Sequence, residues 1–138
     1  MQYNAKIEQE GRRWSAVFVD APGCATCASS QKNVLAAARE ALQGWLEAHL
    51  VDGRAPARPA ASARGTVALD VDPQVAVAIA LRWARQEAGL TQGQLASRIG
   101  ISQQQVAKLE RPEANPSVAT LRKVAEALGV RLHLELVA

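Results

Sequence analysis

The first twenty residues alternate between apolar and polar side chains in two short runs. Residues 3–8 and 14–19 each place an apolar side chain at every second position, and Gly11 lies between the runs. This two-residue period is typical of half-buried strands joined by a turn, so the runs predict a β-hairpin. Turn-forming residues follow at 20–23 and lead into a short extended piece at 24–28.

A helical period then replaces the alternation. Apolar residues recur at three- and four-residue spacing over 34–50, with Ser29 or Ser30 before them as a cap and Gly53 after them as a stop. Residues 66–71 alternate again and predict a further strand. We therefore expect an α+β unit in which one long helix lies on one face of a small antiparallel sheet.

The second half of the chain has a helical period almost throughout. It is joined to the first half by residues 54–65, which are rich in proline and alanine and have no period. Four helical patterns follow, and they cover residues 72–88, 91–99, 102–110 and 117–128. The tail at 131–137 alternates as a strand does. This change of pattern predicts two domains, residues 1–71 and residues 72–138.

Two of these helical patterns meet at Gly100. Thr91 opens the first pattern and Ser102 opens the second, and each side chain can accept a hydrogen bond from the free backbone N–H groups of a first helical turn. The exposed face of the second pattern carries Gln103, Gln104, Gln105 and Lys108. Because glutamine can bond to both N6 and N7 of adenine, the two patterns predict a helix-turn-helix unit that reads DNA.

Residues 75–128 resemble the phage-repressor (Cro/cI) helix-turn-helix family. The family pattern LTQxxLAxxxGxSxxxVxxxE is matched by Leu90, Thr91, Gln92, Leu95, Ala96, Gly100, Ser102, Val106 and Glu110. The resemblance implies operator DNA as a partner and an all-α domain of the five-helix type, to which this chain adds a C-terminal strand.

The same resemblance implies particular DNA contacts. Gln92, at the start of the first motif helix, would contact a phosphate. Gln103, Gln104 and Lys108 would face base edges or flanking phosphates. The candidate DNA-binding residues are therefore Gln92, Ser102, Gln103, Gln104, Gln105 and Lys108. The alternative is that these side chains form only the solvated face of a helix.

The first half resembles the HicB family of antitoxins. The resemblance is carried by Tyr3, Ala5, Ile7, Glu8, Trp14, Ala16, Phe18, Asp20, Pro22, Gly23, Cys24, Thr26, Ala36, Ala41, Leu42, Trp45 and Leu46. The chain departs from the family at Cys27, where glycine is usual, and at Ser29 and Ser30, where acidic residues are common. The resemblance implies a truncated RNase H-like fold that binds a HicA-like mRNA-cleaving toxin.

We expect no enzymatic activity. RNase H chemistry needs several carboxylates that converge on paired metal ions, whereas the acidic residues of the first half lie mostly at turns, helix faces and element ends. Only Glu8 lies well inside a predicted strand. We therefore expect neither a catalytic residue nor a metal site nor a cofactor.

Cys24 and Cys27 form a CxxC motif between a strand and a helix, the layout of thioredoxin-like proteins. Because the helical pattern starts only after Ser29 or Ser30, we interpret the pair as two reduced structural thiols. A zinc site would need two further ligands, and the chain has no second cysteine pair. A redox switch and a zinc ion shared across a dimer remain the alternatives.

Composition adds little to the DNA argument. The net charge is +3 and the isoelectric point is about 9.2, which is too weakly basic to indicate nucleic acid without the motif. No apolar run approaches the ~18 residues of a membrane span, and the N-terminus has no apolar signal core. We therefore expect a cytoplasmic protein with no membrane partner.

These patterns together predict the antitoxin of a type II toxin-antitoxin system. Its first domain would occlude a HicA-like toxin, and its second domain would repress its own operon. Pairing of the 131–137 strand with that of a second copy would give a homodimer or a higher oligomer. The alternative function is a stand-alone transcription regulator with a ligand- or redox-sensing N-terminal domain.

Overall fold

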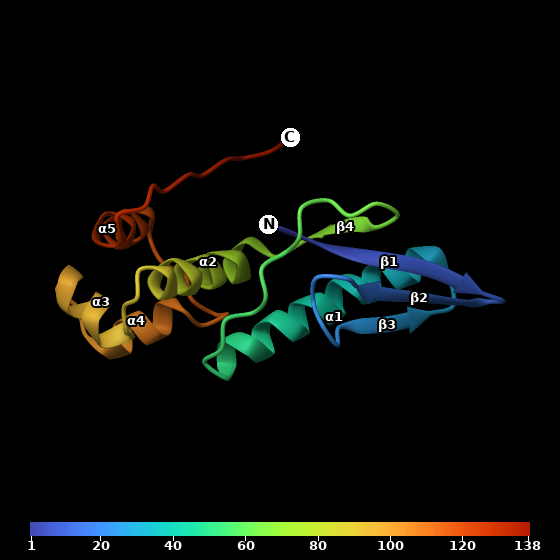
Figure 1. The fold of residues 1–138 in the computed structure, drawn as a ribbon, viewed down its shortest axis with the longest axis horizontal. Coiled ribbons are helices and arrows are strands. Elements are labelled where there is room, and N and C mark those ends of the chain that lie inside the picture. Colours follow the sequence, from blue (N-terminus) through green and yellow to red (C-terminus); the bar gives the residue numbers. More distant parts are fainter.

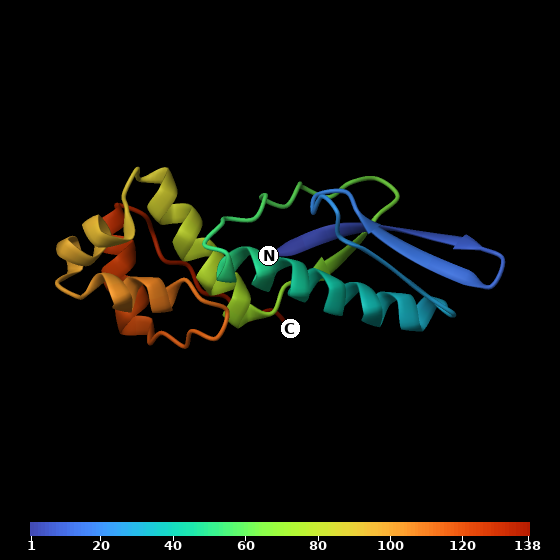
Figure 2. The same ribbon diagram turned by 90° about the horizontal axis from the view of Figure 1, so that it is seen from below.

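The computed structural model describes residues 1–138 and contains two packed units side by side (Figure 1). The first unit is a four-stranded antiparallel sheet with one long helix along one face, as Figure 2 shows from below. Its elements are β1 (Gln2–Glu10), β2 (Arg13–Phe18), β3 (Ala25–Ala28), α1 (Gln31–Val51) and β4 (Val67–Asp70). The strand order is β3-β2-β1-β4. The predicted hairpin, long helix and later strand are confirmed, and so is the α+β class.

The core of this unit lies between the sheet and α1. Tyr3 of β1 is directly opposite Leu69 of β4, and both side chains are buried. Helix α1 begins after Ser30, whose side chain accepts the N–H of Asn33 at 3.1 Å. The apolar stripe that α1 turns toward the sheet consists of Val34, Ala38, Leu42, Leu46 and Leu50. Burial of each leucine contributes about 1.5–3 kcal/mol, so this stripe holds the helix to the sheet.

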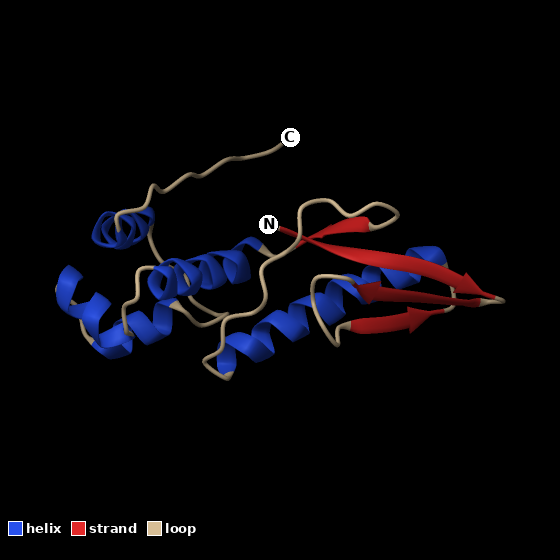
Figure 3. Ribbon diagram, in the orientation of Figure 1, coloured by secondary structure: helices blue, strands red, loops and turns tan.

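The second unit contains the remaining four helices. They are α2 (Pro73–Glu87), α3 (Gln92–Ile99), α4 (Gln103–Leu109) and α5 (Val118–Leu128), drawn in blue in Figure 3. The expectation of a five-helix-type domain is therefore wrong for this chain. Gly129 ends α5 in the left-handed region, with φ of +68°, and the chain continues as an extended segment instead of a further helix. None of the helices combines the length and the apolar character needed to cross a bilayer.

The C-terminal tail does not form a strand within the single chain. Residues 131–138 make no backbone-to-backbone hydrogen bond, and the last such bond runs from Val130 to the carbonyl of Ala125. A strand needs a neighbouring strand edge to exchange hydrogen bonds, and the tail lies over α2 and α5 instead. Pairing of the tail with a second copy stays a prediction.

Helix α2 belongs to both units. Val75, Ala78 and Ile79 are part of the buried cluster that also contains Tyr3 and Leu69 of the sheet. Leu81, in the following turn, packs against the second buried cluster, which consists of Leu95, Ala96, Val106 and Val124. A domain boundary between residues 71 and 72 stays a prediction, because α2 packs against both cores.

Candidate nucleic-acid interface

Caps at three positions fix the turn between α3 and α4. Thr91 Oγ1 accepts the N–H of Gln94 at 3.1 Å, and Gln94 Oε1 accepts the N–H of Thr91 at 2.9 Å. Ser102 and Gln105 repeat this reciprocal arrangement at 3.1 and 2.9 Å. Gly100, with φ of +72°, ends α3 in a conformation that glycine adopts without a steric penalty. The helix boundaries predicted from the sequence are therefore confirmed.

One side of α4 is buried and the other faces solvent. Val106 packs in the second core between α3 and α5, and Leu109 packs against that cluster. The remaining side of the helix presents Gln103, Gln104, Gln105 and Lys108, and all four are exposed. The structure thus brings four of the predicted site residues together on one surface, which we call the recognition face.

The residues of the recognition face differ in the hydrogen bonds that their side chains make within the chain. Gln104 and Lys108 make no hydrogen bond or ion pair within the chain, so their polar groups are available to a partner. Ser102 and Gln105 are partly occupied because they cap the helix reciprocally. The side chain of Gln103 lies against Gly93 in the first turn of α3. Its Oε1 would be 3.7 Å from a Cβ atom placed on this glycine.

Gln92 lies apart from this face. Its side chain is half-buried, and its amide Nε2 donates to Glu110 Oε1 at 3.3 Å. The resemblance implies a phosphate contact for Gln92, and that contact stays a prediction. In the structure its observed partner is a buried carboxylate.

A buried ion group lies behind the recognition helix. Glu110, immediately after α4, is 1% exposed, and it is held by Arg82 (3%) and Arg85 (8%) of α2. Arg85 donates through Nε to Oε2 at 2.6 Å and through Nη2 to Oε1 at 2.9 Å. Arg82 Nε donates to Oε1 at 3.0 Å. Charges this deeply buried are stable only when they are paired, so the group fixes the end of α4 against α2.

The sequence reasoning missed this ion group. Arg82 and Arg85 continue the buried stripe of α2 after Val75, Ala78 and Ile79, at the same three- to four-residue spacing. Two arginines on a buried stripe signal a buried acidic partner. The sequence alone does not show that the partner lies 25 residues or more further along the chain.

The loop between α4 and α5 is also fixed from α2. Gln74 Nε2 donates to the carbonyl oxygens of Glu113 and Ala114 at 3.0 and 2.7 Å. A hollow of about 390 Å³ lies beside this loop, and its polar lining consists of Lys108, Arg111, Glu113 and Asn115. Two cations therefore lie at the C-terminal end of the recognition face.

The first unit holds its polar groups in structural contacts. The Asp20 carboxylate accepts the backbone N–H of Asn4 at 3.0 Å, the Asn4 amide at 2.8 Å and the N–H of Ala60 at 3.1 Å. Cys24 is buried, Cys27 is exposed, and both thiols are free. Burial raises the pKa of the Cys24 thiol, which disfavours the reactive thiolate. No three His, Cys, Asp or Glu side chains are grouped to hold a metal ion.

This geometry is that of a helix-turn-helix DNA-binding protein, and comparison with known proteins agrees. A helix-turn-helix family model matches residues 81–134. An uncharacterised HTH-type transcriptional regulator from Sinorhizobium fredii is 53% identical over 53 residues, which are 38% of this chain and 68% of that protein. A regulator of the same description from Methanothermobacter thermautotrophicus is 42% identical over 55 residues, 40% of this chain and 78% of that protein. The chain belongs to the helix-turn-helix family of transcriptional regulators.

A third relative is a repressor by name. The immunity repressor protein of Bacillus phage phi105 is 46% identical over 48 residues, which are 35% of this chain and 33% of that protein. The chain thus spans about a third of that repressor. Together these relatives support DNA-binding transcription regulation as the function of this chain, with DNA as a partner.

Proposed function

We propose that the protein is a type II antitoxin that represses its own operon and neutralises a HicA-like toxin. The observation that carries the DNA-binding part is the recognition face, which is exposed on a helix fixed by caps and by a buried ion group. Gln103 and Gln104, at the start of α4, would read base edges in the major groove. Lys108 and Arg111, at its other end, would contact phosphates.

The first prediction concerns base reading. Gln104→Ala should weaken binding to operator DNA by about 1–3 kcal/mol and leave non-specific binding nearly unchanged, because the lost contact is to a base. Gel-shift titrations on operator and random duplexes measure both affinities. Gln86→Ala, an exposed glutamine of α2, is the matched control. Equal losses on the two duplexes would remove the assignment of Gln104 as a base reader.

The antitoxin part of the proposal rests on the first unit. The arrangement of one long helix on an antiparallel sheet is compatible with the truncated RNase H-like fold of the HicB family, which this half resembles in sequence. On the sheet face opposite α1, Val17 of β2 and Val19 just after it are each about half exposed. Lys6, Glu8 and Glu10 alternate outward on β1, and Lys6 lies directly opposite Val17 and forms an ion pair with Glu8 at 3.1 Å. An exposed surface with apolar and charged side chains suits a protein partner, and inhibition by occlusion needs only a buried interface of ~1,600 Å².

The second prediction separates the two activities within the full chain. Val17→Asp combined with Val19→Asp should abolish rescue of cells that express a HicA-like toxin from the neighbouring gene, and should leave operator binding intact. Gln104→Ala should weaken operator binding and leave rescue from the toxin intact. Val51→Asp, which is exposed at the end of α1, is the control for an added surface charge. Full rescue by the double variant would place the toxin surface elsewhere, and the lack of any toxin gene beside this one would contradict the antitoxin proposal.

The alternative function is a stand-alone regulator whose N-terminal domain senses a ligand or a redox signal. The observation in its favour is a cleft of about 260 Å³ where β4 passes into α2, with a polar lining of Arg39, Gln43, Asp70 and Asp72. A small ligand there would touch the first turn of α2, which leads to the DNA-binding unit. Operator binding that changes with a small metabolite or with thiol oxidation, in the absence of a toxin, would favour this alternative.

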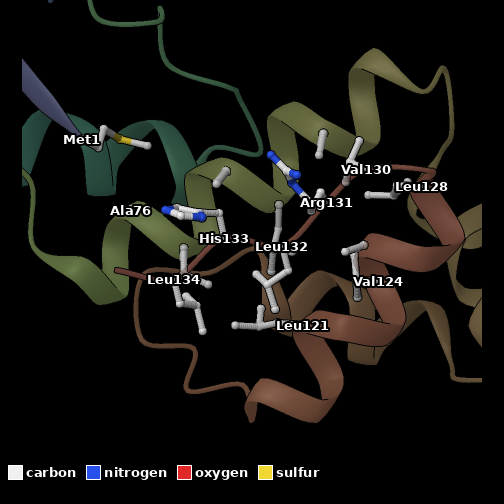
Figure 4. Close-up of a pocket in the computed structure, with 15 residues that line it drawn as sticks. Met1, Ala76, Leu121, Val124, Leu128, Val130, Arg131, Leu132, His133 and Leu134 are labelled. Atoms are coloured by element: carbon white, nitrogen blue, oxygen red, sulfur yellow. The ribbon is translucent and has the colours of Figure 1, made fainter. Parts of the chain in front are cut away.

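We also propose that the protein acts as a homodimer or higher oligomer. A groove of about 340 Å³ lies between α2, α5 and the tail, and Figure 4 shows its apolar side chains turned toward one another. Leu134 of this groove is 58% exposed, and Leu136 further along the tail is entirely exposed. A second copy would cover these side chains and would pair the free backbone of the tail.

A further inference from the structure

The connector between the two units is fastened along its length. We call residues 54–60 the strap. The strap has neither helix nor strand, and it leaves the end of α1 beside α2 and runs toward the sheet (Figure 2). Its sequence is rich in proline and alanine and has no helix or strand period. The structure shows that both units bind it.

The sheet binds the far end of the strap. The Tyr3 hydroxyl donates to the carbonyl of Ala57 at 2.5 Å, and the Asn4 amide donates to the carbonyl of Ala60 at 3.2 Å. Asp20 accepts the N–H of Ala60 at 3.1 Å. Tyr3 is fully buried, and burial with the nearby Asp20 carboxylate raises the pKa of its hydroxyl, so the hydroxyl stays protonated and keeps its role as a donor.

Helix α2 binds the strap from the other side, at residues 56 and 58. The indole Nε1 of Trp83 donates to the carbonyl of Pro56 at 2.9 Å. The Arg58 guanidinium lies 4.6 Å from the centroid of the Trp83 ring and forms an ion pair with Glu87. Contacts from the sheet and from α2 thus hold neighbouring residues of one short segment.

The first residue of the strap reaches the buried ion group. Arg82 Nη1 donates to the carbonyl of Arg54 at 3.3 Å, while Nε of the same guanidinium donates to Glu110 at 3.0 Å. A guanidinium is planar and rigid, so its two contacts cannot move independently. A displaced strap therefore removes a partner from Arg82 and disturbs the group that holds the end of α4.

We propose that Tyr3, Arg58 and Trp83 are positioning residues for operator binding, which act through the strap and Arg82 to hold the recognition helix from the N-terminal unit. The proposal rests on DNA binding by α4 and is independent of any toxin. Its consequence is that whatever binds the N-terminal unit and shifts the strap changes the affinity for DNA.

The test uses the full chain and two single variants that loosen the strap from opposite sides. Tyr3→Phe removes only a hydroxyl, and Arg58→Ala removes the contacts with Trp83 and Glu87. Hydrogen exchange of the amides at 106–110 needs no DNA, and we expect exchange there to rise by about three- to tenfold in each variant. Affinity for a duplex selected by the wild-type protein from random sequences should fall by a similar factor. Arg58→Lys keeps the positive charge, so its exchange at 106–110 and its DNA affinity should lie between those of Arg58→Ala and the wild type.

Two control variants make the same chemical changes away from the strap contacts. Ser15→Ala removes a hydroxyl from the sheet, and Arg64→Ala removes an exposed arginine from the same connector. Neither should change exchange at 106–110 or DNA affinity. Faster exchange of the Ala60 amide with unchanged exchange at 106–110 would overturn the proposal, and so would a uniform rise that includes α1. Because the exchange measurement involves no DNA, a failure of the proposed operator binding is distinguished from a failure of the strap.

Discussion

Replacing Glu110 with alanine is expected to lower the free energy of unfolding by about 3–5 kcal/mol, which is a large part of the stability of an ordinary domain. The carboxylate is the partner of both Arg82 and Arg85, and all three side chains are at least nine-tenths buried. Its removal leaves two guanidinium groups buried without a counter-charge. The desolvation penalty of those two groups then has no compensation, which is why this substitution exceeds the usual effect of a lost hydrogen bond.

The substitution should also affect DNA binding. Because Glu110 fixes the end of α4 against α2, the remaining folded protein should bind operator DNA more weakly than the wild type. Urea denaturation followed by circular dichroism measures the stability, and Glu113→Ala is the matched control. Glu113 is exposed and lies 3.9 Å from Arg111, a surface contact that contributes about 0–1 kcal/mol. If Glu110→Ala stays within about 1 kcal/mol of the wild type, the buried ion group does not hold the unit together.

Deletion of residues 131–138 is expected to convert a dimer into a monomer and to weaken operator binding by about 10²–10⁴-fold. A dimer binds two half-sites at once, so the second contact forms at a high effective concentration, and a monomer loses this advantage. The physical reason for a tail-dependent dimer is the combination of a free backbone over 131–138 and exposed leucines on an apolar groove.

Light scattering gives the oligomeric state, and a titration with a two-half-site duplex gives the affinity. A point variant separates the tail contact from the loss of eight residues. Leu134→Asp should disrupt the dimer, whereas Val118→Asp should not. The two side chains are similarly exposed, at 58% and 60%, but of the two only Leu134 lines the groove. A truncated chain that remains a dimer would show that the tail does not form the interface.

The local features of the fold could be predicted from the sequence. The alternation in β1 and β2, the capping serine and threonine residues, and the glycine at 100 each act within a few residues of their own position. The exposed face of α4 followed from the same local pattern. These features were therefore visible without any knowledge of which segments meet in space.

The features that the sequence reasoning missed depend on contacts between distant residues. Glu110 meets Arg82 across 28 residues, and Tyr3 meets the strap across 54. For the tail, the sequence predicted an element that the single chain does not form. Its alternation predicts a strand, but a strand needs a neighbouring strand edge, and the tail makes no backbone hydrogen bond with one. The count of helices in the second unit was wrong for a different reason. The family resemblance implied five helices, whereas the periodicity of this chain's own residues predicted the four that the structure shows.

The central claim is that this chain binds a particular DNA sequence through α4. The most direct measurement is selection of duplexes from a random-sequence pool by the purified full chain, followed by footprinting of the enriched sequence. The account predicts an enriched site with two symmetric halves about one helical turn apart, ~34 Å, and loss of its protection when Gln103 and Gln104 are both replaced with alanine. Recovery of no common sequence, or a footprint that the double substitution leaves unchanged, would contradict it.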